Sequence, residues 1–125
     1  MKHNLCRAKI HRATVTGGDK NYPGSITIGR NMLVASGILP FELVHVNNIE
    51  NANHWETYVI PTEEDGVIQL NGAPSHLFLK GDLVVIMAFS EVTPVELENF
   101  THTVVLVDPT NTVHKVETKL LRELL

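Results

Sequence analysis

Residues 83–89 are apolar without exception, a pattern that predicts a short β-strand buried on both faces. The run is far shorter than the roughly 18 apolar residues that a membrane-spanning helix needs, and the N-terminus has no signal-peptide pattern. With 125 residues in all, we expect a single domain, residues 1–125, in the cytoplasm and without a membrane partner.

A second strand is predicted near the N-terminus, where apolar and polar residues alternate from Cys6 through Ile10. In this pattern Cys6 faces the core, and its buried thiol is inert. After Arg12 the apolar positions change from even-numbered to odd-numbered residues, so one extra residue predicts a β-bulge there.

The rest of the chain alternates between short strand-like segments and turns. Strands are predicted at residues 25–28, 43–49, 55–60, 67–70, 103–107 and 112–117, and residues 17–24 form a turn-rich connection. The strands at 43–49 and 55–60 are joined by the asparagine-rich loop 50–53, which predicts a hairpin. Residues 31–36 predict a short helix capped by Gly37, Thr93 and Glu96 form a capping box that opens another, and residues 119–125 are leucine-rich at helical spacing. These segments predict a mainly β fold, a closed β-barrel with two or three short helices.

Charge and cysteine content exclude several classes of protein. The net charge is −4, with +5 in residues 1–40 and −9 in residues 41–125, so nucleic acid is not expected as a partner, whereas the basic third could bind a small anion. A single cysteine excludes an internal disulfide and any multi-cysteine metal site. The seven histidines include no pair at i, i+2 or i, i+4, so no metal is expected.

The dipeptide Gly24-Ser25 is a weak signal by itself, but it permits a specific reaction. A serine hydroxyl can attack the carbonyl of a preceding glycine when the turn is strained, because glycine has no Cβ to obstruct the approach. The peptide becomes an ester, elimination leaves dehydroalanine, and hydrolysis yields an N-terminal pyruvoyl group. Such a ketone can form a Schiff base with an amine and accept electrons, as pyridoxal cofactors do.

Two segments around this dipeptide, residues 9–16 (KIHRATVT) and 21–28 (NYPGSITI), resemble the start of the bacterial aspartate 1-decarboxylases. The resemblance continues in the same order through residues 35–39 (ASGIL), 57–60 (TYVI), 71–73 (NGA) and 81–86 (GDLVVI), and it spans residues 1–116. This family converts L-aspartate to β-alanine and CO2 for pantothenate and coenzyme A synthesis.

The resemblance implies a double-psi β-barrel and self-cleavage between Gly24 and Ser25, which gives fragments 1–24 and 25–125. It also implies a covalent pyruvoyl group made from Ser25, without a metal or pyridoxal phosphate. The family forms homotetramers with active sites between subunits, and some relatives need a maturation factor.

Roles for individual residues follow from the same resemblance. Ser25 is the cleavage nucleophile, and Thr57 hydrogen-bonds the Gly24 carbonyl while the ester forms. Tyr58 is the proton donor after CO2 leaves, and Lys9 lies near the substrate carboxylates.

Further matches provide the surroundings of this site. Gly72, Ala73 and Pro74 form a loop that approaches the substrate, although the family usually has alanine at the third position and proline removes one N–H donor. His11, Tyr22 and Asn71 match supporting positions.

One departure concerns substrate recognition. Three residues before Thr57 the family has an arginine that clamps a substrate carboxylate, and here the residue is His54, which has fewer donors and is only partly charged near neutral pH. The substitution predicts weaker aspartate binding, a different substrate or lost activity. Two alternatives therefore stay open: a paralogue that decarboxylates another amino acid, and a non-catalytic structural or regulatory barrel.

Overall fold

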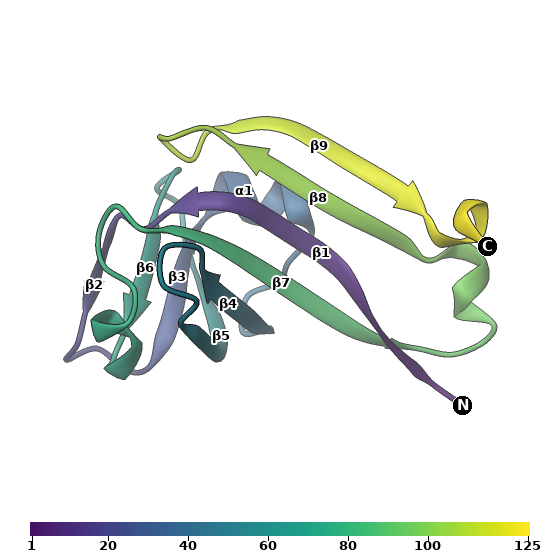
Figure 1. Cartoon of the computed structure of the whole chain (residues 1–125), viewed down its shortest axis with the longest axis horizontal. Helices are drawn as coiled ribbons and strands as arrows, with labels where there is room; N and C mark the ends of the chain where they lie inside the picture. Colours follow the sequence, from purple (N-terminus) through teal and green to yellow (C-terminus); the bar gives the residue numbers. More distant parts are fainter.

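A computed structural model describes all residues, 1–125, as one mixed nine-stranded sheet with a single α-helix (Figure 1). The strands are β1 (His3–Thr14), β2 (Gly17–Asp19), β3 (Ser25–Gly29), β4 (Leu43–Asn48), β5 (His54–Thr62), β6 (Ile68–Asn71), β7 (Leu83–Val92), β8 (Thr101–Val107) and β9 (Val113–Leu120). The helix is α1 (Arg30–Ser36), and η1 (Ala73–His76), η2 (Glu96–Asn99) and η3 (Leu121–Leu124) are single 3-10 turns. The predicted mainly β fold is confirmed.

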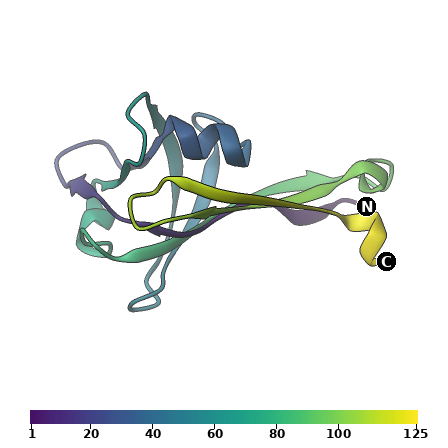
Figure 2. The ribbon, with the colours of Figure 1, turned by 90° about the horizontal axis from the view of Figure 1, so that it is seen from above.

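The strands follow the order β2-β6-β3-β5-β4-β7-β1-β8-β9. Three pairs are parallel, β3 with β5, β1 with β8 and β2 with β6, and the others are antiparallel. The compact part of the molecule surrounds one hydrophobic core, while β1, β7, β8 and β9 continue from it as a long arm that carries both termini (Figures 1 and 2).

No helix is long and apolar enough to cross a membrane.

Two bulges interrupt β1. The register against β7 shifts between Ile10 and Ala13, and Arg12 has φ 60°, so the predicted bulge is confirmed. A second shift lies between Cys6 and Ala8. It reverses the side of the sheet on which Cys6 lies, so the prediction that Cys6 faces the core is wrong, and its thiol is half-buried. Partial burial still raises the pKa of Cys6.

The apolar run 83–89 lies in β7, where buried and half-buried residues alternate. Val84, Ile86 and Ala88 are fully buried in the core, whereas Val85 and Met87 on the other face are only half-buried. The prediction of a strand buried on both faces is therefore wrong for the single chain, because its own elements cover only one face completely.

The other predicted elements are mostly present. Strands β4 and β5 form the predicted hairpin, α1 ends at Gly37 with φ 75°, and the backbone N–H of Gly37 donates to Leu33 O. Thr93 and Glu96 make the reciprocal bonds of a capping box, although the turn that follows is 3-10.

Two segments differ from the sequence predictions. The turn-rich connection at 17–24 contains the short strand β2, which pairs with β6. The predicted tail helix at 119–125 is wrong, because β9 continues to Leu120 in pairing with β8 and only a 3-10 turn follows. Backbone pairing with a neighbouring strand outweighs the helical spacing of the leucines.

Candidate active site

Ser25 is the first residue of β3 and is completely buried. Its hydroxyl donates to the carbonyl oxygen of Pro23 at 2.9 Å and accepts a hydrogen bond from Nδ2 of Asn71 at 3.2 Å. Asn71 lies directly opposite Ser25 in β6, and its Nδ2 also donates to Thr27 Oγ1 at 3.0 Å. These contacts hold the hydroxyl against the backbone immediately upstream of it.

The backbone at Gly72 packs closely against Gly24. A Cβ atom at Gly72 would lie 2.8 Å from the Cα atom of Gly24 and 3.3 Å from the carbonyl oxygen of Tyr22, and the φ of Gly72 is 79°. The Gly72 N–H donates to Asp19 O at 2.8 Å, which fixes this loop. Only glycine fits at residue 72, both for its conformation and for the space beside Gly24.

In strand β5, Thr57 and Tyr58 precede the ladder to β3, at the end where Ser25 begins β3. The parallel register pairs Ile26 with Val59, and its extension toward the N-terminus of β3 puts Ser25 level with Tyr58 and Gly24 level with Thr57. Thr57 is buried and Tyr58 is 37% exposed, as expected for neighbours on opposite faces of a strand. Tyr58 therefore shares a face of the sheet with Ser25.

A hollow of about 270 Å³ opens on this same face. It is lined by Asp19, Tyr22, Thr27, Ile60, Gln69 and Asn71. Tyr22 and Asn71, which sequence analysis assigned supporting positions, thus line the same hollow, and Asn71 also contacts Ser25.

The loop after Gly72 forms the 3-10 turn η1, in which Ala73 is exposed and Pro74 is buried. The Pro74 carbonyl accepts the backbone N–H groups of Leu77 at 2.9 Å and Phe78 at 3.2 Å. Proline is well suited to this position, because the first residues of a helical turn have no partner for their N–H groups.

Two predicted site residues lie elsewhere in the chain. Lys9 and His11 belong to β1, which is separated from β3 in the sheet by β5, β4 and β7. His11 borders a different hollow of about 390 Å³, together with Arg12, Asp108 and His114. Partial burial, followed by the charges of Lys9 and Arg12, lowers the pKa of His11.

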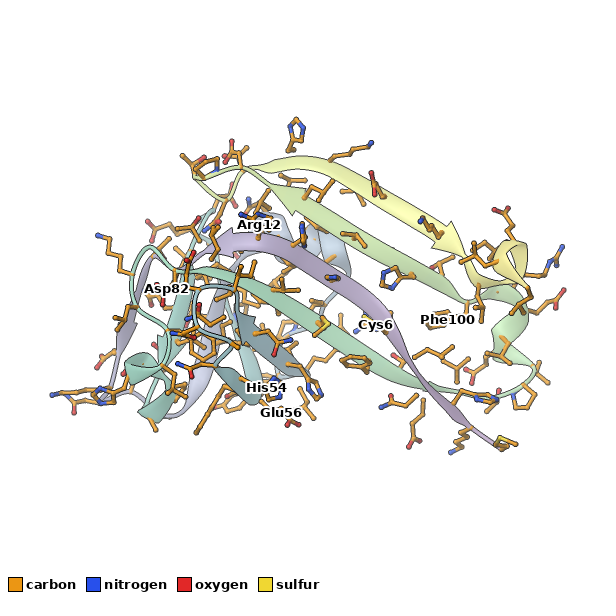
Figure 3. All side chains as sticks on the ribbon, in the orientation of Figure 1. Cys6, Arg12, His54, Glu56, Asp82 and Phe100 are labelled. Carbon is orange, nitrogen blue, oxygen red and sulfur yellow. The ribbon has the colours of Figure 1, made fainter.

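His54 is engaged with its own hairpin. Its Nδ1 atom lies 2.6 Å from Asn47 Oδ1 and its Nε2 atom lies 3.3 Å from Glu56 Oε2. Glu56, which lies beside His54 (Figure 3), is also 3.7 Å from Nε2 of His45 through its Oε1 atom. Sequence analysis missed this group of His45, His54 and Glu56, because only the register of the hairpin, which pairs His45 with Glu56 and Asn47 with His54, brings it together. The sequence predicted the hairpin, but it did not predict which residues of the two strands pair with each other.

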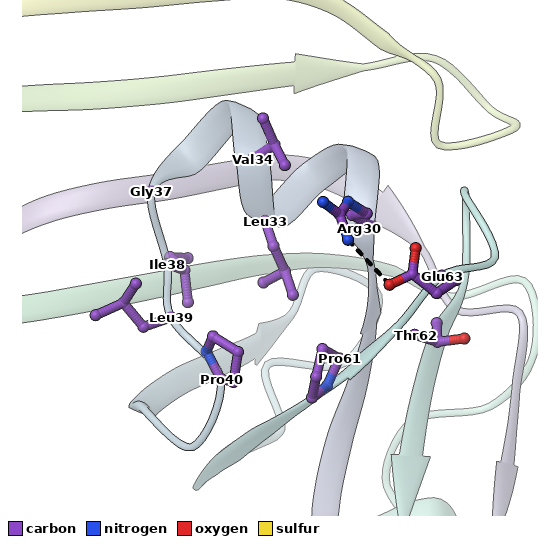
Figure 4. A pocket seen from close by; sticks show the side chains of 10 residues that line it. All are labelled: Arg30, Leu33, Val34, Gly37, Ile38, Leu39, Pro40, Pro61, Thr62 and Glu63. Atoms are coloured by element: carbon purple, nitrogen blue, oxygen red, sulfur yellow. Dashed lines mark hydrogen bonds and ion pairs between the residues drawn. The ribbon is translucent and has the colours of Figure 1, made fainter.

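A groove with apolar walls is separate from the Ser25 group. It has a volume of about 450 Å³ and lies between α1 and the end of β5, with Leu33, Val34 and Ile38 on its walls and an Arg30–Glu63 ion pair of 2.9 Å at its edge (Figure 4). None of its lining residues belongs to the Gly24-Ser25 surroundings.

The fold and the site together define a mainly β protein with a glycine–serine junction whose serine is buried and held by an asparagine. The family model described as aspartate decarboxylase matches residues 1–114. The chain is 44% identical over 117 residues to the aspartate 1-decarboxylase of Hydrogenobaculum sp. (strain Y04AAS1), covering 94% of this chain and 93% of the relative. It is 46% identical over 116 residues to that of Campylobacter jejuni subsp. doylei, covering 93% and 92%, and 40% identical over 117 residues to that of Desulfotalea psychrophila, covering 93% and 98%.

The chain belongs to the aspartate decarboxylase family. The resemblance found in the sequence motifs is thereby confirmed.

Proposed function

We propose that this chain is a self-cleaving, pyruvoyl-dependent aspartate 1-decarboxylase that converts L-aspartate to β-alanine and CO2, which serves pantothenate synthesis. The observation that carries the proposal is the buried Ser25 hydroxyl, which directly follows Gly24 and is held by Asn71. Family membership and full-length similarity to proteins named aspartate 1-decarboxylase support the same activity.

Self-cleavage starts at the Gly24-Ser25 peptide. Oγ of Ser25 attacks the Gly24 carbonyl carbon, the C–N bond breaks, and the hydroxyl proton passes to the released nitrogen, which gives an ester. Loss of the Ser25 Cα proton then breaks the Cβ–Oγ bond and releases residues 1–24 as a carboxylate. Water replaces the nitrogen as ammonia and leaves a ketone at the start of residues 25–125.

Three neighbours assist this reaction. The Pro23 carbonyl orients the Ser25 hydroxyl, because it accepts that hydrogen bond at 2.9 Å. Thr57 lies level with Gly24 and is the donor for the oxyanion that develops on the carbonyl as the ester forms. Gly72 packs against Gly24 and restricts its backbone.

The residues around Ser25 fit a ketone at this position, because Asn71 Nδ2 is a donor and a keto oxygen is an acceptor. The pyruvoyl group supplies an electrophilic carbonyl that accepts the electron pair left when CO2 departs. Tyr58, level with Ser25 on the same face of the sheet, returns a proton to the substrate carbon. The hollow that Tyr22 and Asn71 line receives part of the substrate.

A second candidate, a decarboxylase of a different amino acid, is favoured by one observation. Nδ1 of His54 faces Asn47 Oδ1 at 2.6 Å and Nε2 faces the Glu56 carboxylate at 3.3 Å, so both ring nitrogens are already engaged by protein oxygens. A histidine in this environment is a weaker anion ligand than the arginine it replaces.

The proposal also covers the type of β-barrel and the oligomeric state. We place the chain among the double-psi β-barrels, supported by three parallel strand pairs and by hydrogen bonds from Thr16 to Ile68 that connect the end of β1 to β6. A homotetramer with sites between subunits accounts for Lys9 and His11, which belong to β1, a strand that is not a neighbour of β3 in the sheet. It would also cover the half-buried face of β7. The proposal also includes a maturation factor as a further partner and the cytoplasm as the location.

Intact-mass measurement of the purified chain, before and after prolonged warming, tests the proposal. We expect fragments 1–24 and 25–125, the larger one beginning with a carbonyl that borohydride reduces. Ser25→Ala should remain full length, whereas Thr27→Ala, which removes the other hydroxyl bonded to Asn71, should still cleave. Full-length wild-type chain alone, also after co-expression with maturation factors of the family, would support the non-catalytic alternative.

Release of CO2 from a panel of amino acids then separates the two enzymatic candidates. Turnover of aspartate supports the first, and turnover of another acid without aspartate supports the second. His54→Arg should raise aspartate activity if the missing guanidinium limits binding; an unchanged activity would contradict that role.

A further inference from the structure

We propose that His45, His54 and Glu56 form a binding site for a divalent transition-metal cation of the zinc type. The three residues come from the two strands of the β4–β5 hairpin and share one face of it. Their potential ligand atoms all lie within 4.8 Å of one another. In Figure 3, His54 and Glu56 lie next to each other at the lower edge of the sheet.

The hydrogen bonding of His54 leaves a nitrogen lone pair in this cluster. Asn47 Oδ1 can only accept, so His54 Nδ1, 2.6 Å away, carries the proton that it donates. In the neutral imidazole, Nε2 is then an acceptor, and it faces another acceptor, Glu56 Oε2, at 3.3 Å. Two acceptors at this distance repel each other unless a cation, either a proton or a metal ion, lies between them.

The position of His45 is evidence that the cation between His54 and Glu56 is a metal ion and not a proton. Its Nε2 atom lies 3.7 Å from Glu56 Oε1, too far for a hydrogen bond. Ligands about 2.0–2.2 Å from a tetrahedral zinc ion lie roughly 3.3–3.6 Å from one another. Glu56 faces the two histidines with its two oxygens, Oε2 at 3.3 Å from His54 Nε2 and Oε1 at 3.7 Å from His45 Nε2, and both distances are close to that spacing.

The surroundings orient both histidines. The His45 ring packs edge-on against Phe89 with centroids 4.9 Å apart, and the Asn47 bond fixes the tautomer of His54, as outer hydrogen bonds do at metal sites. The side chains of His45, His54 and Glu56 are 31%, 44% and 51% exposed, so a hydrated ion can reach them. Two histidines and a glutamate are a known zinc ligand set, and they leave a fourth position for water or a carboxylate.

Metal binding can be measured without reference to catalysis. The full-length Ser25→Ala chain and the wild type are stripped with a chelator, and zinc is titrated against a chromophoric competitor. We expect one zinc ion per chain in both, so the result does not depend on whether the chain cleaves itself. Cobalt in place of zinc should give the visible absorption of a tetrahedral nitrogen–oxygen site.

Matched variants locate the site. His45→Ala and Glu56→Gln should abolish the competition for zinc, and Asn47→Ala should weaken zinc binding about 10–100-fold through loss of the tautomer-fixing bond. His114→Ala, an exposed histidine on β9, is the control and should bind like the wild type. Zinc should raise the Tm of the wild type and of His114→Ala, but not that of Glu56→Gln.

Two results would overturn the proposal. If the wild type does not compete for zinc, the cation between His54 and Glu56 is a proton. If His45→Ala and Glu56→Gln, shown to be folded by circular dichroism, bind zinc as the wild type does, the ion is held elsewhere.

Discussion

The side-chain amide of Asn71 donates a hydrogen bond to the hydroxyl of Ser25 across the β3–β6 ladder, at 3.2 Å. Both residues are essentially excluded from solvent. A buried hydroxyl with one amide donor has a fixed orientation, and the same donor can stabilise negative charge as it develops nearby.

Replacing Asn71 by alanine should therefore affect processing more than folding. We expect self-cleavage to slow about 100-fold, because a preorganised donor is lost. We also expect the free energy of unfolding to fall by about 1–3 kcal/mol, because the Ser25 and Thr27 hydroxyls lose their donor. A time course of intact mass and urea unfolding measure the two effects. Thr27→Val is the control for the second bond, and cleavage of Asn71→Ala at the wild-type rate would show that Asn71 has no part in processing.

The glycines at residues 72 and 81 provide a matched pair. Both have positive φ, 79° and 97°, so alanine at either costs about 1–2 kcal/mol of backbone strain. Only at Gly72 would the new Cβ meet Gly24, since nothing lies within 4 Å of a Cβ at Gly81. We expect Gly72→Ala to block cleavage and Gly81→Ala to cleave normally, as judged by gel electrophoresis. Equal cleavage by the two variants would remove Gly72 from the processing site.

Asn111 connects three segments of the fold. Its side chain accepts from Thr14 N and donates to Thr14 O and Gly66 O, each at 2.8 Å, and its φ is 61°. We expect Asn111→Ala to lose about 3 kcal/mol in urea unfolding, because buried backbone groups lose their partners. Asn111→Gly should lose about 1 kcal/mol less, because glycine accepts the positive φ without strain. A glycine variant as stable as the wild type would show that the backbone conformation matters and the bonds do not.

The lowered pKa of His11 predicts a pH-dependent stability. Because the folded-state pKa lies below the usual 6.5, the unfolded chain binds more protons between those two values, and stability falls as the pH drops through this range. Urea unfolding at about pH 7.5 and about pH 5.5 should show a smaller difference for His11→Gln than for the wild type. The lowered pKa values of Glu96 and Asp108 also make stability fall as the pH drops. Their effect comes nearer pH 4, below the range of this comparison. His114→Gln is the control, and an equal reduction in that variant would contradict the assignment to His11.

Local sequence signals predicted most of the elements. Alternation of apolar residues predicted β1 and its bulge at Arg12, and Gly37 correctly marked the end of α1. The motifs around Gly24 and Ser25 predicted the family, since several of them occur in the right order along one chain. Each of these signals is carried by residues close to one another in the sequence.

The failures involve residues whose environment is set by distant segments. A second bulge, visible only in the pairing of β1 with β7, turned Cys6 away from the core. Pairing with β8 kept Lys119 and Leu120, the start of the leucine-rich tail, in a strand despite the helical spacing. In both places, hydrogen bonds to another strand decided the outcome.

The sequence by itself determined most of the strands along the chain and the family, and it predicted Ser25 as the reactive serine. Only the tertiary structure decided that Asn71 holds Ser25, that Gly72 packs on Gly24, and that a hairpin register gathers His45, His54 and Glu56. The physical reason is that strand register depends on the whole sheet, and a shift of one residue moves every side chain to the opposite face.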